Sequence, residues 1–87
     1  MSDVIDNPET ARFELTEEGE TAVAHYREAD GRLYIDYVEA PPALRGKGTA
    51  GRLMAGVMAA ARQRRLEVVP ICGYAAAWIR RHPEPLD

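Results

Sequence analysis

A glycine-rich segment in the middle of the chain has the residue types and spacing of a phosphate-binding loop. Residues 41–51 have the sequence PPALRGKGTAG, and an uninterrupted helical pattern follows. Glycine permits positive φ angles and close approach of a ligand, and the first amides of a helix have no carbonyl partners within it. Such amides lie at the positive end of the helix dipole, which favours phosphate. We therefore expect an anion site here, with Arg45 and Lys47 adding positive charge.

Two side chains outside this segment could take part in group transfer. Glu39 ends the strand before the segment, where its carboxylate could accept a proton from an amine, directly or through water. Cys72 ends a later strand just before a helix, where the helix dipole would favour the nucleophilic thiolate. An edge carboxylate can equally be only solvated, and a cysteine at a strand end is commonly a small apolar core residue. The sequence leaves both interpretations open.

Three strands are expected before the glycine-rich segment. Alternating apolar residues predict them over residues 10–16, 20–29 and 32–39. The Asp30-Gly31 pair is a strong hairpin signal, so we expect an antiparallel meander. The alternation places Leu33, Ile35 and Tyr37 on one face of the third strand. His25, midway along the second strand, is expected to be an exposed cross-strand partner.

The second half of the chain predicts a crossover. A helix is expected from Thr49, as a plausible N-cap, to about residue 65, followed by a strand over 66–71 and a short helix over 74–81. Because the long helix connects two strands, the later strand should lie parallel to the preceding one through a right-handed crossover. The expected fold class is α/β of the α+β type, with a mixed sheet made of a three-strand meander and a βαβ crossover.

Size and composition limit the chain to one small domain over residues 1–87. It has 87 residues, of which 46% are hydrophobic, enough for a single core. Residues 1–39 hold eleven acids and three bases, whereas residues 40–87 hold eight bases and three acids, which suits a polyanionic ligand at the glycine-rich segment. A single cysteine and no zinc-type spacing lead us to expect no metal. Without an apolar span or a signal-peptide pattern, we expect a cytoplasmic protein and no membrane partner.

Three other glycine motifs fit this segment less well. The pattern Gly46-x-Gly48-x-x-Gly51 matches the dinucleotide fingerprint, but that motif belongs to a doubly wound parallel sheet rather than to a meander. A Walker loop is excluded because Lys47 is followed by glycine instead of serine or threonine. Gly48-x-x-Gly51 also resembles the clamp of a KH domain, but that clamp lies between two helices, whereas a proline-rich turn precedes this segment. No aromatic platform supports nucleic acid, so we expect no nucleic-acid partner.

The motif Arg45-Gly46-Lys47-Gly48-Thr49-Ala50, between a strand and a helix, resembles the acyl-CoA loop of the GNAT acetyltransferase superfamily. The amides of that loop bind the pyrophosphate of CoA. Further blocks extend the resemblance over nearly the whole chain, to a small single-domain subfamily: DNPE at 6–9, RFEL at 12–15, EAPP at 39–42, LRGKG at 44–48, VPIC at 69–72 and RRHPE at 80–84. The resemblance implies a GNAT-like fold that binds acetyl-CoA.

Site residues follow from the resemblance by position. It assigns the pyrophosphate to the amides of Gly46, Lys47, Gly48, Thr49, Ala50 and Gly51. It pairs the strand end at Val38 and Glu39 with the pantetheine arm, and it places Cys72 where the subfamily has its proposed nucleophile. Arg80 and His82, in a block that the subfamily keeps, are expected to reach a CoA phosphate, although His82 could instead cap its helix. Tyr37 stands where many members have histidine.

The implied function is an N-acetyltransferase that moves an acetyl group from acetyl-CoA to an unidentified amine, either directly or through a Cys72 acyl intermediate. An alternative is a CoA-binding or partner-binding module without turnover, because the helices that usually shape the acceptor site are missing. We expect a monomer or a weak dimer.

Overall fold

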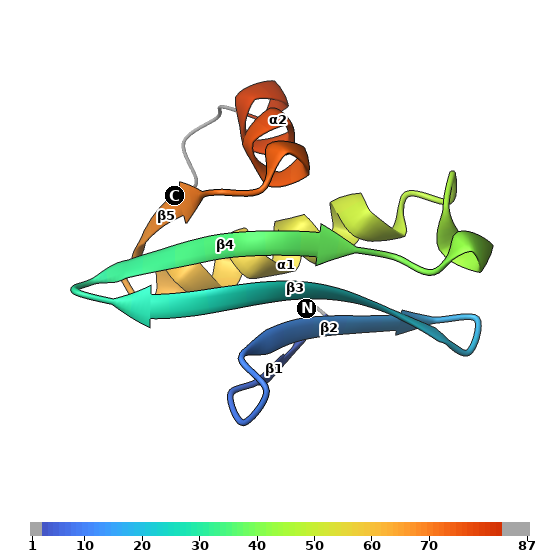
Figure 1. Cartoon of the computed structure of the whole chain (residues 1–87), viewed down its shortest axis with the longest axis horizontal. Helices are drawn as coiled ribbons and strands as arrows, with labels where there is room; N and C mark the ends of the chain where they lie inside the picture. The colour runs from blue at the N-terminus through green and yellow to red at the C-terminus, as the bar shows by residue number, and fades with distance from the viewer. Residues whose placement is uncertain (1–2, 83–87) are drawn as a thin grey trace.

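Five strands form a single mixed sheet in the computed structural model, which describes residues 3–82 (Figure 1). In chain order the elements are β1 (Ile5–Asn7), β2 (Arg12–Glu17), β3 (Glu20–Ala29), β4 (Arg32–Glu39), the short 3-10 helix η1 (Pro42–Leu44), α1 (Thr49–Gln63), β5 (Glu67–Pro70) and α2 (Gly73–Arg81). The strand order is β1-β2-β3-β4-β5, with antiparallel pairs up to β4 and a parallel pair between β4 and β5. The predicted mixed class, meander, crossover and final helix are confirmed, and β1 is a further strand that the sequence pattern did not indicate.

Two tight turns fix the register of the meander. Glu18 and Gly19 have φ angles of 54° and 77°, and Asp30 and Gly31 have φ angles of 56° and 77°. Two consecutive positive φ angles belong to the two-residue turn whose twist matches that of antiparallel strands. Each turn joins its strands without further loop residues, so the hairpin predicted at Asp30-Gly31 is confirmed.

A β-bulge at Asp36 changes which side chains of β4 face the core. Ile35 and Tyr37 pair with consecutive residues of β3, so Asp36 is an extra residue on β4. One extra residue reverses the alternation of all the side chains beyond it. Val38 therefore packs against the core, and Tyr37 is 54% exposed on the other face. The prediction that Tyr37 shares a face with Leu33 is wrong for this reason.

Helix α1 covers one face of the sheet and lies behind it in Figure 1. Its buried side chains recur at the three- and four-residue spacing of one helix face and include Leu53, Met54, Val57 and Ala61. They pack against buried residues of the strands, which include Phe13, Leu15, Leu33 and Ile35. Within residues 3–82, neither α1 nor α2 is long and apolar enough to cross a membrane.

Both ends of α1 differ slightly from the prediction. Gly48, with a φ angle of 79°, is the N-cap, so Thr49 is the first helical residue rather than the cap. At the other end the helix stops at Gln63, and Arg65 adopts a left-handed φ of 58°. The Leu66 amide then donates to the Ala61 carbonyl at 2.9 Å. A left-handed residue followed by a bond back into the last turn is a common way for helices to end.

A polar cluster connects β1 and β3 with the end of α1. The buried Tyr26 hydroxyl donates to the Asp6 carboxylate at 2.7 Å, and the Arg64 guanidinium donates to the other carboxylate oxygen at 2.7 Å. Burial, and then the hydrogen bond to Asp6, raise the pKa of Tyr26 to about 12. The short strand β1 is thus held through a neutral phenol and an ion pair.

Candidate functional site

The glycine-rich segment forms a tight loop that presents backbone amides at the start of α1. Gly46 and Gly48 both have φ angles of 79°, which glycine adopts without strain. Hydrogen bonds within residues 3–82 leave unpaired the amides of Gly46, Gly48, Thr49, Ala50 and Gly51. The Lys47 amide differs, because it donates to the Leu44 carbonyl at 3.2 Å. The loop therefore presents to a ligand all the amides expected from the sequence except that of Lys47.

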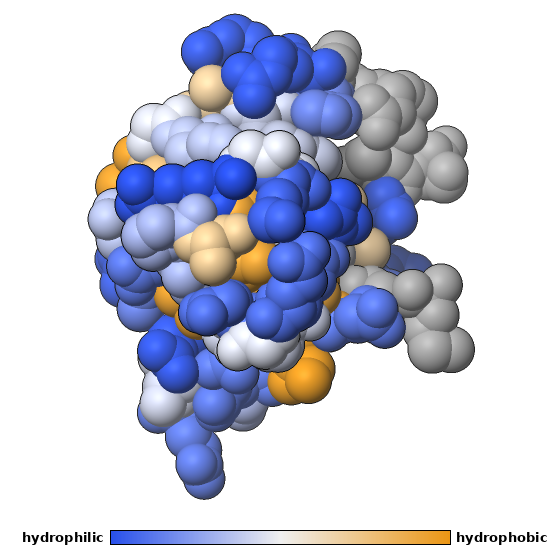
Figure 2. All heavy atoms as spheres, turned by 90° about the vertical axis from the view of Figure 1, so that its right-hand side faces the viewer, coloured by the Kyte–Doolittle hydropathy of each residue, from blue (hydrophilic) through white to orange (hydrophobic). Residues whose placement is uncertain are grey.

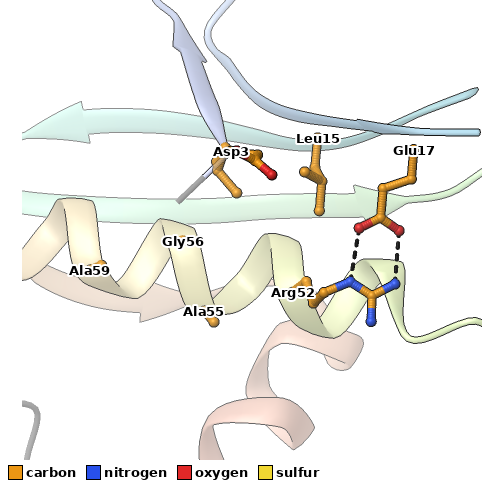
Figure 3. Close-up of a pocket in the computed structure, with 8 residues that line it drawn as sticks. Asp3, Leu15, Glu17, Arg52, Ala55, Gly56 and Ala59 are labelled. Atoms are coloured by element: carbon orange, nitrogen blue, oxygen red, sulfur yellow. Dashed lines mark hydrogen bonds and ion pairs between the residues drawn. The ribbon is translucent and has the colours of Figure 1, made fainter. Parts of the chain in front are cut away.

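Glu17 of β2 holds the first turn of α1 from the side. Its carboxylate accepts two hydrogen bonds from the Arg52 guanidinium, both of 2.8 Å (Figure 3). It also accepts one from the buried Thr49 hydroxyl at 2.6 Å, while Arg52 donates to the Lys47 carbonyl at 2.9 Å. The bonds from Arg52 and then Thr49 lower the pKa of Glu17 to about 2. One ionised carboxylate thus fixes both the loop and the helix start.

Two cationic side chains flank the loop. The Lys47 ammonium lies 3.4 Å from the Glu18 carboxylate, so its charge is shared with the turn between β2 and β3. Arg45 is exposed, and its guanidinium has no hydrogen bond or ion pair to any residue within 3–82. The end of the molecule that carries this loop is mostly hydrophilic (Figure 2). Arg45 is therefore the more available cation for an anionic ligand.

A pocket of about 250 Å³ lies beside the loop. Its walls come from the end of β4, the loop, the first turn of α1 and the first turn of α2, and include Ala40, Arg45, Gly48, Gly51 and Tyr74. Helix α2 lies close to α1 at Gly51: a Cβ at this position would lie 3.4 Å from Trp78 Nε1 and 4.0 Å from the Tyr74 hydroxyl. Both aromatic residues therefore face α1.

Strands β4 and β5 separate beside this pocket. Their parallel pairing runs from Arg32 to Ile35 on β4 and stops there. The Ile35 carbonyl accepts the amides of Ile71 and Cys72, both at 3.0 Å, as the chain turns away into α2. Beyond the bulge, residues 36–39 have no strand partner on the β5 side within the described part of the chain. This free strand edge, which includes Val38, leads directly toward the glycine loop.

Glu39 lies on the face of the sheet opposite α1, together with a histidine. Its carboxylate is 3.0 Å from His25 Nε2 on β3. The His25 ring also stacks on Tyr37, with 6.1 Å between ring centroids. His25 is a cross-strand partner, as expected, but it is half-buried rather than exposed, and it contacts the candidate base. A carboxylate and an imidazole in contact can accept a proton and pass it to solvent.

Cys72 lies where β5 passes into α2. It is the N-cap residue of α2, and its half-buried side chain packs against the core. Its amide donates to Ile35, which is four residues from Glu39 along β4, or roughly 13 Å of strand. The structure therefore places Cys72 and Glu39 at opposite ends of the free strand edge and does not pair them.

His82 and Arg80 lie at the end of α2. The His82 ring stacks on Trp78 with 3.9 Å between centroids, and Nδ1 is 2.8 Å from the Trp78 carbonyl. His82 therefore caps its helix, the structural role that the sequence left open, while Nε2 has no partner within residues 3–82. Arg80 is exposed. Because Trp78 packs on Gly51, both residues lie on the α2 side of the loop.

Several residues at the site were not found from the sequence. Glu17, Arg52 and the hydroxyl of Thr49 brace the loop, and His25 contacts Glu39. Only the opposite charges of Glu17 and Arg52 could have indicated this contact, because the two residues are 35 positions apart in the sequence. The register that the two-residue turn imposes would place His25 opposite Asp36, with Glu39 on the other face. Only the bulge at Asp36 brings His25 and Glu39 to the same face, so no local sequence signal indicated their contact.

Comparison with family models gives one match: residues 12–87 match the model described as GCN5-related N-acetyl-transferase. The matched range includes every element from β2 onward, and with them the glycine loop, Glu39 and Cys72. Comparison with curated proteins gives no match.

Proposed function

The chain belongs to the GCN5-related N-acetyltransferase family, and we propose that it binds acetyl-CoA at the glycine loop and transfers the acetyl group to an amine. The observation that carries this proposal is the alignment of the unpaired amides at the start of α1 with the free edge of β4. A ligand with a diphosphate at one end and amide groups along an extended arm matches both features, and CoA is such a ligand.

The loop would bind the pyrophosphate through its unpaired amides. Gly46 and Gly48 have positive φ angles, and the unpaired amides lie at the positive end of the α1 dipole, where helix starts bind phosphate. Arg45 supplies a charge that no residue within 3–82 neutralises, and Lys47 supplies a second. Arg80 and the free His82 Nε2, on the α2 side, would meet a further phosphate.

The edge of β4 would hold the pantetheine arm and the thioester. Residues 36–39 lack a strand partner on that side, so the arm can pair there as an added strand would. Val38 turns its side chain into the core, which fixes the backbone of this edge. An unpaired backbone amide of the edge would donate to the thioester carbonyl and stabilise its oxyanion.

Glu39 would act as the proton acceptor in direct transfer. The amine nitrogen attacks the thioester carbonyl, the C–S bond breaks, and CoA leaves as the thiolate. The proton lost by the amine passes to Glu39, directly or through water, and then by way of His25 to solvent or to the departing thiolate. His25 thus supplies an imidazole next to Tyr37, the position where the resemblance leads one to expect histidine.

Cys72 defines the alternative, covalent route. There its thiolate attacks the thioester, CoA leaves, and the amine then takes the acetyl group from sulfur with release of the Cys72 thiolate. The half-buried position of Cys72 against the core and its separation from Glu39 favour the direct route.

Calorimetry with acetyl-CoA, CoA, NAD and ATP tests the ligand. We expect the two CoA species to bind at least tenfold more tightly than NAD or ATP, because only they carry a pantetheine arm for the β4 edge. Equal affinities would contradict the proposal. Release of CoA from acetyl-CoA over a panel of amines then tests turnover, and binding without any release would indicate the module without catalysis.

A further inference from the structure

A second pocket, of about 530 Å³, opens on the face of the sheet opposite α1. Its walls include Arg12, Glu14, Val23, Glu39, Ala40 and Arg45. Ala40 and Arg45 also line the pocket beside the glycine loop. The two pockets therefore meet across the end of β4, so that a molecule in one lies next to a molecule in the other.

Strand register places a carboxylate and a guanidinium on either side of this pocket. Val23 of β3 pairs with Glu14 of β2 and with Glu39 of β4, so it forms the floor between them. Arg12 lies two residues from Glu14 on the same face of β2. Two strand spacings separate the backbones of β2 and β4, which is about 10 Å. A bridging ligand must be shorter than this span, because the Glu39 carboxylate already reaches over β3, where it contacts His25.

Arg12 has hydrogen-bonding capacity that the described residues do not use. Its Nη2 donates to Glu14 at 2.9 Å, but its Nε is buried and has no acceptor within residues 3–82. Buried N–H groups in folded proteins nearly always have a partner. The side chain as a whole is 35% exposed, so a ligand carboxylate could approach the guanidinium N–H groups that Glu14 leaves free and form charge-assisted bonds with them. Arg45, also without a partner in this range, supplies a second positive charge to the same pocket.

We propose that this pocket is the acceptor site and that it takes a small amine with a carboxylate at the other end of a short chain. The inference rests on the proposed function for the donor, acetyl-CoA. The amine lies at Glu39, which accepts its proton as the C–N bond forms and the C–S bond of the thioester breaks. The carboxylate lies at Arg12 and Arg45. An α-amino acid without a side-chain amine is too short to meet Glu39 and Arg12 together.

Steady-state kinetics with matched acceptors tests the substrate class. A short series of ω-amino carboxylates is compared with the alkylamines of the same chain length and with the corresponding diamines. We expect KM for the best amino carboxylate to be about ten- to a hundredfold below that of its alkylamine, because the carboxylate adds charge-assisted hydrogen bonds. Equal KM values across the three classes, or a preference for diamines, would overturn the inference.

Arginine variants assign the effect to the pocket. In Arg12→Gln the ratio of the KM for the alkylamine to the KM for the amino carboxylate should fall toward one. Arg12→Lys keeps the charge but not the planar guanidinium, so it should keep part of the preference. Arg62→Gln, which removes an exposed arginine from the last turn of α1, is the matched control and should keep all of it. A preference that survives in a folded Arg12→Gln variant would also overturn the inference.

Binding measurements separate this inference from the proposed function. Calorimetry with acetyl-CoA tests the donor site alone, and NMR titration with the amino carboxylate tests the acceptor pocket alone through the amides of Glu14, Thr21 and Val23. If acetyl-CoA binds but these amides do not respond to the amino carboxylate, the inference is overturned and the proposed function remains intact. A response of these amides without acetyl-CoA binding would support the pocket and contradict the donor site.

Discussion

Glu17 and Arg52 form a two-point ion pair that joins the end of β2 to the first turn of α1, with both bonds at 2.8 Å (Figure 3). The same carboxylate accepts the Thr49 hydroxyl, and the same guanidinium holds the Lys47 carbonyl. The amides proposed to bind pyrophosphate are therefore positioned by the Glu17 side chain of β2. Loop shape depends on the charge of Glu17.

The low pKa of Glu17 predicts a loss of stability in acid. Its pKa in the folded protein, about 2, lies below its ordinary value of 4.5, so the stabilisation is complete above that ordinary value. It is lost as the pH falls from about 4.5 toward 2. Urea unfolding midpoints measured over this range should decline in the parent protein, and Glu17→Gln should remove part of the decline. Glu20→Gln, at the neighbouring exposed position, is the control and should behave like the parent.

Replacing Gly48 with alanine should damage both stability and ligand binding. A side chain at φ 79° is strained, and its Cβ would lie 3.1 Å from Arg52 Nη1. We expect the free energy of unfolding to fall by about 1–2 kcal/mol and the affinity for acetyl-CoA to fall with it. Gly73→Ala is the matched control, because Gly73 begins α2 with open space around it and no positive φ. Equal effects of the two changes on CoA affinity would contradict the role given to the loop.

The elements with local signals were predictable from the sequence. Asp30-Gly31 specifies a tight turn wherever it lies between strands, and the stripe that includes Leu53 and Val57 specifies a buried helix face. The glycine loop was also a local signal, since its two left-handed residues are both glycine. For the same reason, the meander of β2, β3 and β4 and the position of the loop after it could be derived from the sequence.

The features that depend on distant partners were not predictable. The bulge at Asp36 arises from how β4 pairs with β3, and nothing in the sequence around it marks an extra residue. Strand β1 is only three residues long and has little alternation to detect. The brace between Glu17 and Arg52, and the separation of Cys72 from Glu39, depend on packing across the sheet. The bulge at Asp36 and the separation of Cys72 from Glu39 decide which residues reach the proposed acceptor.

Removing the carboxylate of Glu39 should slow transfer without weakening donor binding. We expect Glu39→Gln to lower kcat by about a hundredfold or more, as for loss of a general base. His25→Gln should cause a smaller loss, because it removes only the group that contacts Glu39. Glu28→Gln, an exposed change at the other end of β3, serves as control. A Glu39→Gln enzyme with unchanged kcat would exclude this residue as the base.

The raised pKa of Tyr26 predicts instability in alkali. Its pKa in the folded protein, about 12, exceeds the ordinary value of 10, so the neutral phenol stabilises the fold below about pH 10. This contribution is lost as the pH rises from 10 through 12. Tyr26→Phe should cost about 1 kcal/mol at neutral pH, because the bond to Asp6 is lost. It should also flatten the alkaline decline in unfolding midpoint, whereas Tyr37→Phe, at an exposed ring, should leave that decline as it is.

Cys72→Ala decides between direct and covalent transfer. Because Cys72 packs half-buried against the core and lies at the other end of the free β4 edge from Glu39, we expect kcat to stay within a few-fold of the parent. Cys72→Ser is the matched variant, since serine keeps the size, favours the N-cap position and is a much weaker nucleophile than a thiolate. Mass spectrometry after acid quenching with acetyl-CoA should then show no acetyl group on the parent Cys72. An acetylated Cys72 together with loss of turnover in both variants would establish the covalent route, and Glu39 would then have to act on the amine at the second step alone.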